Sequence, residues 1–429
     1  MYSKKVSRVI QKVRERPLIF FALLNAILFL AVSANLDQSV GNCGIERQLA
    51  VKILDGQVPY SDFFSEYPPL AILSFLLPAL LSATQPAYGF LFALEIFLLD
   101  LVVLFILAKL ASRLKMQVWR VLGIYTICLL AMGPIVTGRF DLLPAALVML
   151  ALYAFISGRN KTAWVILALG ATAKLYPLVI VPLFALYLLR NRRYRRLIQG
   201  IAVFGGVVLA LNLPWIIINA DGFWQFLSYH MERGLHSESS YASVLLVGQM
   251  LGLTQVDAAL TYGSWNISSP MADALYQASF YVTAGFLLLA YALYAHRLWE
   301  KLATTVETEI FSSESIELIL RYSLLVVFLM LITSKVLSPQ FLIWLCPLLP
   351  LVVVRWRYAL PVLFLFIGGI TQYIYPHHYL EFESVVPYLV VLLAARNLLL
   401  VAMAVLLLLP LRSLPVNGEE QIGVGGMHI

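Results

Sequence analysis

Long apolar runs, separated by short polar segments, occupy most of the chain between residues 18 and 410. A helix of about 20 apolar residues is long enough to cross the hydrocarbon core of a bilayer. The pattern therefore predicts membrane-spanning helices at 18–35, 88–111, 119–136, 141–157, 197–219, 274–295, 317–335, 340–354, 358–375 and 386–410.

Two further apolar segments need a separate interpretation. Residues 162–189 are too long for a single span and are interrupted by polar residues around Lys174, so we interpret them as a helical hairpin with two short arms. Residues 68–83 begin with Pro68 and Pro69 and are short. They either cross the bilayer or lie along its surface.

The positions of the basic residues decide between these alternatives, because cytoplasmic loops collect Lys and Arg. Basic clusters occur in the N-terminal tail and at 109–120, 159–161, 190–196, 297–301 and 355–357. All of them fall on one side only if 68–83 does not cross and 162–189 crosses twice. This topology has about 12 spans, with both tails, 1–17 and 412–429, in the cytoplasm. Because the first span lacks a small-residue cleavage site, we do not interpret the N-terminal tail as a cleavable signal.

The composition agrees with a membrane protein and excludes a soluble one. Of the 429 residues, 61% are hydrophobic and only 12% are charged, and the mean hydropathy is +0.86. We therefore expect an all-α polytopic membrane protein with a single domain, 1–429. The net charge of +7 comes from short clusters between spans, so nucleic-acid binding is not expected. The three cysteines have neither metal-ligand spacing nor the pattern of a disulfide framework.

The polar, aromatic-rich segments all fall on the outer face in this topology. They are the first outer loop at 36–87, the stretches 137–141 and 171–177, the stretch 228–240 within the large outer loop 220–273, and the stretches 333–341 and 372–384. Membrane proteins bind substrates in cavities between helices, and ionisable residues near the bilayer mark such sites. We therefore expect the functional site at the outer mouth of the helical bundle.

The first outer loop combines a surface helix with two nearby acids. Residues 44–55 have apolar positions at helical spacing, which predicts a helix lying on the membrane, and Gly56 ends it. Asp62 and Glu66 follow, four residues apart, and would share one helical face if the short link between them is helical. Each acid either caps a helix or pairs with a loop arginine, or it acts as a general base toward a hydroxyl group.

Three charged residues fall where spans meet the outer surface. Asp141 begins a span and fits helix capping as well as a role in the site. Arg139 beside it suits a phosphate or Asp141 itself. Lys174 lies between hairpin arms too short to reach the far surface, so its ammonium needs a partner below the headgroups. A lipid phosphate and a structural ion pair would both meet that need.

The stretch 228–240 contains four residues suited to binding: His230, Arg233, His236 and Glu238. The two histidines have no third ligand at helical spacing, so a metal site is not predicted. Histidine and arginine donors fit a phosphate and sugar hydroxyls, and the alternative is a solvated loop.

Ionisable residues inside the predicted spans must find partners within the bilayer. Glu95 and Asp100 fall on the second span, and Arg396 falls near the middle of the last. We predict a structural ion pair between Asp100 and Arg396, with a proton path in a transporter as the alternative.

Several motifs together resemble one family. The segments DGQVPYSDFFSEYPPL, GRFDLLPAAL, ATAKLYPLVIVPL, RGLHSES and SPQFLIWLCPLLP occur in this order between residues 18 and 355. As a set they resemble the polyprenol-phosphate-mannose-dependent mannosyltransferases of glycosyltransferase family 87, within the integral-membrane GT-C superfamily.

The resemblance implies a fold, an activity and a location. The fold would be of the GT-C type, with interfacial helices in the first outer loop. The enzyme would move a hexose, mannose on the resemblance alone, from a polyprenyl-phosphate donor to a glycolipid, glycan or other acceptor. The reaction would invert the sugar and need no metal or other cofactor. The protein would be a multi-pass protein of the cell (plasma) membrane that serves the cell envelope, with its active site on the extracytoplasmic side.

The resemblance also implies roles for individual residues. The register of the family's catalytic Asp holds Asn42 here, and an amide cannot accept the proton of an acceptor hydroxyl. The candidate catalytic residues are therefore Asp37, Asp62 and Glu66. The donor phosphate would be bound by Arg139, Lys174, Arg233 and His230. Further substrate contacts are expected from Tyr60, Tyr67, Asp141, His236, Glu238 and Gln340.

Two other classes of function stay open at this point. A transporter or flippase of a lipid-linked saccharide would show inverted repeats and charges at the midplane, whereas the polar motifs here cluster at one face. A noncatalytic member of the same fold is the second alternative, because Asn42 replaces the expected acid.

Overall fold

The computed structural model describes residues 11, 13–34, 43–301, 311–352, 356 and 358–409. Asp37 and Asn42 lie outside these residues, as do the tail at 412–429 and most of the tail at 1–17. The expectations attached to them therefore stay predictions.

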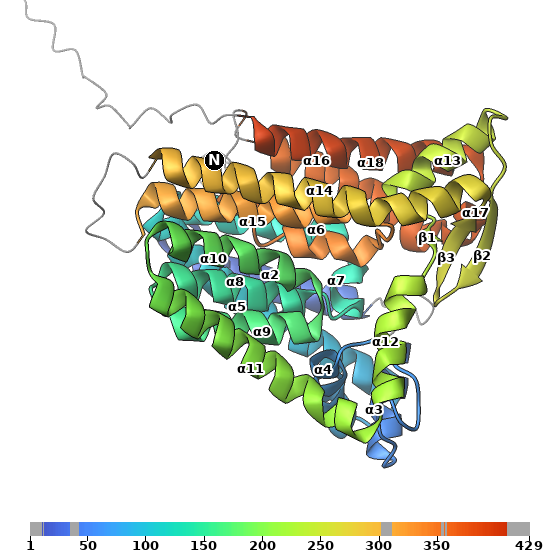
Figure 1. The fold of residues 1–429 in the computed structure, drawn as a ribbon, viewed down its shortest axis with the longest axis horizontal. Helices are drawn as coiled ribbons and strands as arrows, with labels where there is room; N and C mark the ends of the chain where they lie inside the picture. Colours follow the sequence, from blue (N-terminus) through green and yellow to red (C-terminus); the bar gives the residue numbers. More distant parts are fainter. Residues whose placement is uncertain are drawn as a thin grey trace, which may run out of the picture.

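The chain forms a bundle of apolar helices (Figure 1). Its elements are α2 (Pro17–Ala34), α5 (Gln85–Arg113), α6 (Val118–Met132), α7 (Pro134–Gly138), α8 (Leu142–Ile156), α9 (Asn160–Ala173), η1 (Tyr176–Ile180), α10 (Val181–Arg190), α11 (Tyr194–Ile218), α14 (Pro270–Lys301), α15 (Ser313–Thr333), η3 (Pro339–Leu345), η4 (Leu349–Leu351), α16 (Ala359–Gln372) and α18 (Pro387–Leu408). Each predicted span coincides with one helix or with consecutive helices, so the expected helical membrane fold is confirmed. Six helices in the described part are long and apolar enough to cross a membrane by themselves.

Breaks in two of the spans create the turns that carry polar residues. α6 ends at Gly133, whose positive φ of 51° favours glycine, and Pro134 begins the short helix α7. α9 ends at Lys174, where the backbone is extended, and the chain returns through η1 and α10. The hairpin predicted at 162–189 is thus confirmed, with Lys174 at its tip.

The first outer loop contains α3 (Gly44–Leu54) and α4 (Pro69–Leu80), which pack against each other and against α5. α3 confirms the helix predicted at 44–55. α4 has 12 residues, which is about 18 Å of helix and too short to cross a core about 30 Å thick. The link from Asp62 to Glu66 is not helical, because residues 57–68 form turns and irregular segments, so the two acids do not share a helical face. The Asp62 carboxylate accepts a hydrogen bond from the Val58 amide at 2.7 Å, and such local bonds compete with helix formation.

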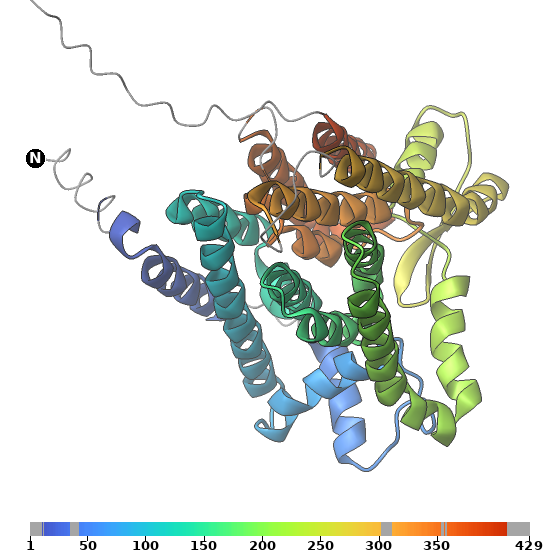
Figure 2. The same cartoon turned by 60° about the vertical axis from the view of Figure 1, so that its left-hand side comes forward.

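A small sheet and several short helices gather at one end of the long helices (Figures 1 and 2). They are α12 (Ala220–Glu232), β1 (Leu235–His236), α13 (Ser240–Met250), β2 (Asp257–Thr261), β3 (Ser264–Ser268), η5 (Tyr373–His377) and α17 (Tyr379–Glu383). The strands are antiparallel in the order β1-β3-β2, with Leu235 opposite Ile267. Tyr262 and Gly263 join β2 to β3, and both have positive φ, as a two-residue hairpin turn requires.

The apolar core runs through the middle of the bundle and contains large buried side chains such as Tyr125, Trp164 and Phe184. Other apolar side chains face outward. On α11 and α14, for example, Ile217 and Phe280 are more than 70% exposed. Large apolar surfaces of this kind are what helices present to lipid. The fold therefore agrees with the multi-pass membrane protein expected from the sequence.

The ion pair predicted between Asp100 and Arg396 is wrong. Arg396 pairs with Glu238 instead, with Nη1 2.5 Å from Oε2, and both side chains are fully buried. Asp100 accepts two hydrogen bonds from the side chain of Asn25, at 3.0 and 3.1 Å. The chain that leads into α13 packs beside α18, and so brings a loop carboxylate to Arg396.

Candidate active site

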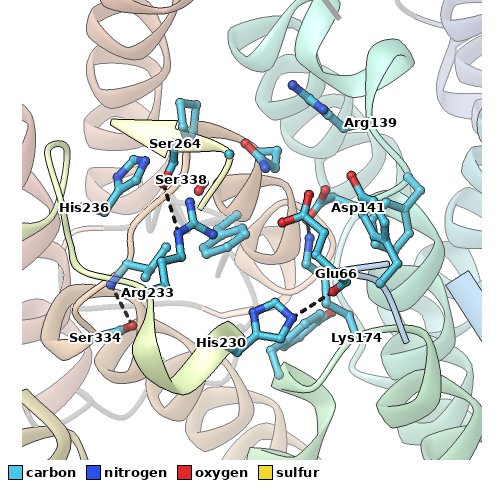
Figure 3. A pocket seen from close by; sticks show the side chains of 18 of the residues that line it. Glu66, Arg139, Asp141, Lys174, His230, Arg233, His236, Ser264, Ser334 and Ser338 are labelled. Carbon is cyan, nitrogen blue, oxygen red and sulfur yellow. Dashed lines mark hydrogen bonds and ion pairs between the residues drawn. The ribbon is translucent and has the colours of Figure 1, made fainter. Parts of the chain in front are cut away.

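A cavity of about 530 Å³ lies between the helical bundle and the short elements at its end (Figure 3). Its volume is in the range of small-molecule sites. Its polar lining includes Glu46, Glu66, Tyr67, Arg139, Asp141, Lys174, His230, Arg233, His236, Ser264, Ser334, Ser338, Gln340, Tyr375 and Tyr379. Each of the six polar stretches assigned to the outer face supplies lining residues. The predicted convergence of these stretches on one cavity is therefore confirmed.

The tip of the hairpin holds a buried ion pair. Lys174 Nζ lies 2.6 Å from Asp141 Oδ1, and Trp344 Nε1 donates a hydrogen bond to the same oxygen at 2.8 Å. The rings of Phe140, Phe341 and Trp344 surround the ammonium, with centroids 4.6 to 5.2 Å from Nζ. Asp141 makes no side-chain cap to α8. Of the alternatives left open by the sequence, the structure thus shows the ion pair for Lys174.

Arg139 takes part in a second pair, with Glu46. The Arg139 Nη1 atom lies 3.7 Å from Oε1 of Glu46, which is too long for a hydrogen bond, and Nη2 donates to the Tyr375 hydroxyl at 3.1 Å. Glu46 is only 1% exposed. Burial raises the pKa of Glu46, and the charge of Arg139 opposes this rise.

Arg233 is a half-buried cation that follows α12. Its Nε atom donates a hydrogen bond to Ser264 Oγ at 3.1 Å. Among the described residues, no carboxylate oxygen lies within 4.0 Å of its guanidinium. Burial lowers the pKa of Arg233, but a guanidinium stays charged in proteins. The cavity therefore contains a positive charge that no carboxylate of the described chain balances at short range.

His230 and Glu66 connect α12 to the first outer loop (Figure 3). His230 Nε2 lies 2.8 Å from the backbone carbonyl oxygen of Glu66, so this nitrogen carries the proton. Burial lowers the pKa of His230, which keeps the ring neutral. The Glu66 carboxylate lies near Tyr229, and its charge contributes to a raised pKa of the tyrosine, after burial. Among the candidate bases in the described residues, Glu66 lines the cavity and Asp62 does not.

Three residues expected in the site lie outside the cavity. Asp62 is exposed, and its carboxylate stabilises a turn. Tyr60 packs among aromatic rings and donates its hydroxyl to the backbone carbonyl of Tyr67. Glu238 is held by Arg396. These contacts explain the positions of all three side chains without a role in the cavity.

His236 lines the cavity, but one of its ring nitrogens is already engaged. Nδ1 accepts a hydrogen bond from the Glu238 amide at 3.3 Å, and the backbone of Leu337 lies close to the ring. Burial holds the pKa of His236 well below its usual range. The side chain is therefore neutral and ties β1 to the segment after α15.

Several lining residues were not predicted from the sequence. Glu46 falls in a helix interpreted only as a surface helix, and Ser264 falls in an unpredicted β-hairpin. Tyr375 and Tyr379 belong to a stretch that was predicted to face the site, but they were not singled out. The available signals were an acid in the first turn of a loop helix and the Tyr262-Gly263 turn, a dipeptide suited to a hairpin.

The charges of the cavity fall into two groups. The acids are Glu46, Glu66 and Asp141, and the cations are Arg139, Lys174 and Arg233. Two acid–cation pairs form, Arg139 with Glu46 and Lys174 with Asp141, and among the described residues neither Glu66 nor Arg233 has an opposite charge within 4.0 Å. The charge of Glu66 acts on Arg233 from a longer distance. In the described part of the chain, no three His, Cys, Asp or Glu side chains are grouped as metal ligands.

Fold and site together define a multi-pass helical membrane protein with a charged small-molecule cavity at one end of its bundle. The sequence model of Glycosyltransferase family 87 matches residues 64–326, which is more than half of the chain. The chain therefore belongs to this family and is a membrane glycosyltransferase, as its motifs predicted. The solved structure of ArnT from Cupriavidus metallidurans in the apo state is similar at 12% identity and a TM-score of 0.46, over 91% of this chain and 76% of that chain. No curated protein matches the sequence.

Proposed function

We propose that the protein transfers a hexose, mannose on the family resemblance, from a polyprenyl-phosphate donor to a hydroxyl of a glycolipid, glycan or other acceptor. The transfer inverts the anomeric carbon in a single displacement and uses no metal or other cofactor. The cavity faces the extracytoplasmic side of the cell (plasma) membrane, and both termini lie in the cytoplasm.

Arg233 is the observation that carries this proposal. A half-buried guanidinium without a nearby carboxylate is costly, and an anionic ligand would supply the missing charge. The planar donors of arginine suit two oxygens of one phosphate. Lys174 already has a carboxylate partner, so it would act as a secondary contact to the phosphate, whereas Arg139 lies beside Glu46 on the other side of the cavity from Arg233 (Figure 3).

The edge of the cavity also suits a lipid carrier. Leu175, directly after Lys174, lines the cavity and is 44% exposed, and Leu178 on η1 is 43% exposed. Apolar side chains next to a charged cavity would contact the polyprenyl chain while the cations hold its phosphate. A nucleotide sugar has no apolar tail to occupy such a surface.

The proposed chemistry needs one base and a stabilised leaving group. A first-loop carboxylate in the cavity, Glu46 or Glu66, removes the proton of the acceptor hydroxyl. The hydroxyl oxygen then attacks the anomeric carbon, and polyprenyl phosphate leaves with its charge held by Arg233 and its neighbours. A positioned donor to a developing anion typically contributes a factor of about 10² to 10³ in rate.

A transfer assay with defined donors tests this function. The purified protein, in lipid vesicles with an extract of membrane acceptors, receives labelled polyprenyl-phosphate mannose, polyprenyl-phosphate glucose or the corresponding nucleotide sugars. We expect label in a new glycosidic product only from a lipid-phosphate donor. Transfer from a nucleotide sugar would contradict the proposal. Passage of an intact lipid-linked sugar across the vesicle bilayer, without a new product, would support a flippase instead.

A further inference from the structure

Glu46 is a buried acid with an unusual place in the fold. It lies in the first turn of α3, is 1% exposed and lines the cavity. Neither of its carboxylate oxygens accepts a hydrogen bond from another described residue. Buried carboxylates normally have such partners, so the free lone pairs need an explanation.

The surroundings of the other two cavity acids differ. Asp141 receives hydrogen bonds from Lys174 and Trp344 on one oxygen. Glu66 is only partly buried, so water can reach its carboxylate. Glu46 has only the charge of Arg139 at 3.7 Å, beyond hydrogen-bond distance. Of the two buried acids of the cavity, Glu46 and Asp141, Glu46 is therefore the one with both oxygens available to a ligand.

Arg139 is held in place by another contact, so it does not close onto Glu46. Its Nη2 atom donates to Tyr375 on η5, which belongs to the far end of the chain. Arg139 thus supplies a nearby positive charge and leaves the lone pairs of Glu46 free. A nearby cation also favours the ionised carboxylate, which is the form that accepts a proton.

We propose that Glu46 is the general base of the transfer reaction, in contact with the acceptor hydroxyl. This inference rests on the proposed function. The proton of the hydroxyl moves to the Glu46 carboxylate as the acceptor oxygen bonds to the anomeric carbon. The bond from that carbon to the phosphate oxygen breaks, and its electron pair leaves with polyprenyl phosphate. Water then takes the proton from Glu46 and restores the carboxylate.

The arrangement of the cavity fits this assignment. An inverting displacement needs the base and the leaving group on opposite faces of the sugar. Figure 3 shows Arg139 and Arg233 on opposite sides of the cavity, and Glu46 lies beside Arg139. With the phosphate at Arg233, the sugar would lie between its leaving group and Glu46. Burial raises the pKa of Glu46, and the charge of Arg139 opposes this rise.

Capping of α3 by Glu46 is the structural alternative, because an acid in the first turn favours a helix. Glutamine has the same size but cannot act as a base, so Glu46→Gln separates the two roles. If Glu46 is the base, E46Q should lower kcat by a factor of about 10² to 10⁴ and leave the KM for the donor within about twofold. E46D should retain part of the activity, and added formate should restore part of it to E46A. Asp55→Asn, at the exposed C-terminal end of the same helix, is the matched control.

An E46Q enzyme with kcat within about tenfold of the wild type would overturn the assignment, as would an E46A enzyme that formate does not restore. Absence of transfer by the wild type itself would instead refute the proposed function, so the two failures are distinct. If E46Q does not fold, the pH dependence of kcat/KM tests the assignment instead, because it is measured on enzymes that keep Glu46. An acidic limb that does not respond to replacement of Arg139 would then overturn the proposal.

Discussion

Arg396 and Glu238 are 158 positions apart, and their side chains form a fully buried ion pair with Nη1 2.5 Å from Oε2. Arg396 also donates a hydrogen bond to the backbone carbonyl of Glu238, at 2.7 Å. These bonds fasten the segment that follows Arg233 and His236 to α18. The position of the proposed phosphate ligand therefore depends on a helix that is remote from it in sequence.

Breaking this pair should destabilise the protein strongly. Removing one partner of a buried ion pair typically costs about 3 to 5 kcal/mol, because the other charge stays buried. We expect R396Q and E238Q each to lower the midpoint of thermal unfolding in detergent. E300Q is the control, since its exposed pair with Arg297 at 3.2 Å should contribute at most about 1 kcal/mol. Equal shifts in E238Q and E300Q would contradict this account.

Replacement of Asp62 should leave catalysis nearly unchanged. Its exposed carboxylate accepts one backbone hydrogen bond and does not line the cavity. D62N should therefore cost about 1 kcal/mol of stability or less and change the transfer rate by no more than about twofold. The measurement is a transfer assay beside thermal unfolding. A loss of about 100-fold in rate with unchanged unfolding would instead make Asp62 the base.

The pH dependence of the reaction should report on Glu46 and Arg139. A base acts when deprotonated, so kcat/KM should fall as the pH drops through the pKa of Glu46, which burial raises. The charge of Arg139 lowers that pKa. In R139Q the pKa should rise further, and the acidic limb should move to higher pH. R47Q should not move it, because Arg47 bonds to the Ala83 carbonyl outside the cavity. If the acidic limb of the pH profile stays at the same pH in R139Q, the prediction is contradicted.

Much of the fold could be predicted because lipid imposes a simple pattern on the chain. Long apolar runs and basic clusters gave the spans, and the break at Lys174 gave the hairpin. The same reasoning predicted that separate polar stretches would line one cavity. It succeeded because the ends of neighbouring spans are forced together at the membrane surface.

Individual contacts were less predictable, because they depend on tertiary packing. The partner of Arg396 comes from a loop rather than from a span, and the hydrophobic periodicity of the chain does not indicate which residue that partner is. Asp62 and Glu66 have helical spacing, yet local turn bonds override it. Asn266 fits a glycosylation sequon, but it is 5% exposed and its side-chain amide donates to Thr261. A polar residue that the sequence suggests is exposed can therefore be buried, with its side chain bonded within the fold.

The most direct test of the account measures transfer from polyprenyl-phosphate mannose against donor concentration for the wild type and R233Q, with R47Q as a matched arginine control. The account predicts that the wild type and R47Q form the labelled glycosidic product. R233Q should do so about 10² to 10³ times more slowly, because the phosphate loses its unshared cation. R233K should recover only part of the rate, since a lysine cannot donate in a planar fork. Wild-type transfer that is unchanged in R233Q, or no transfer from any lipid-phosphate sugar, would contradict the central claim.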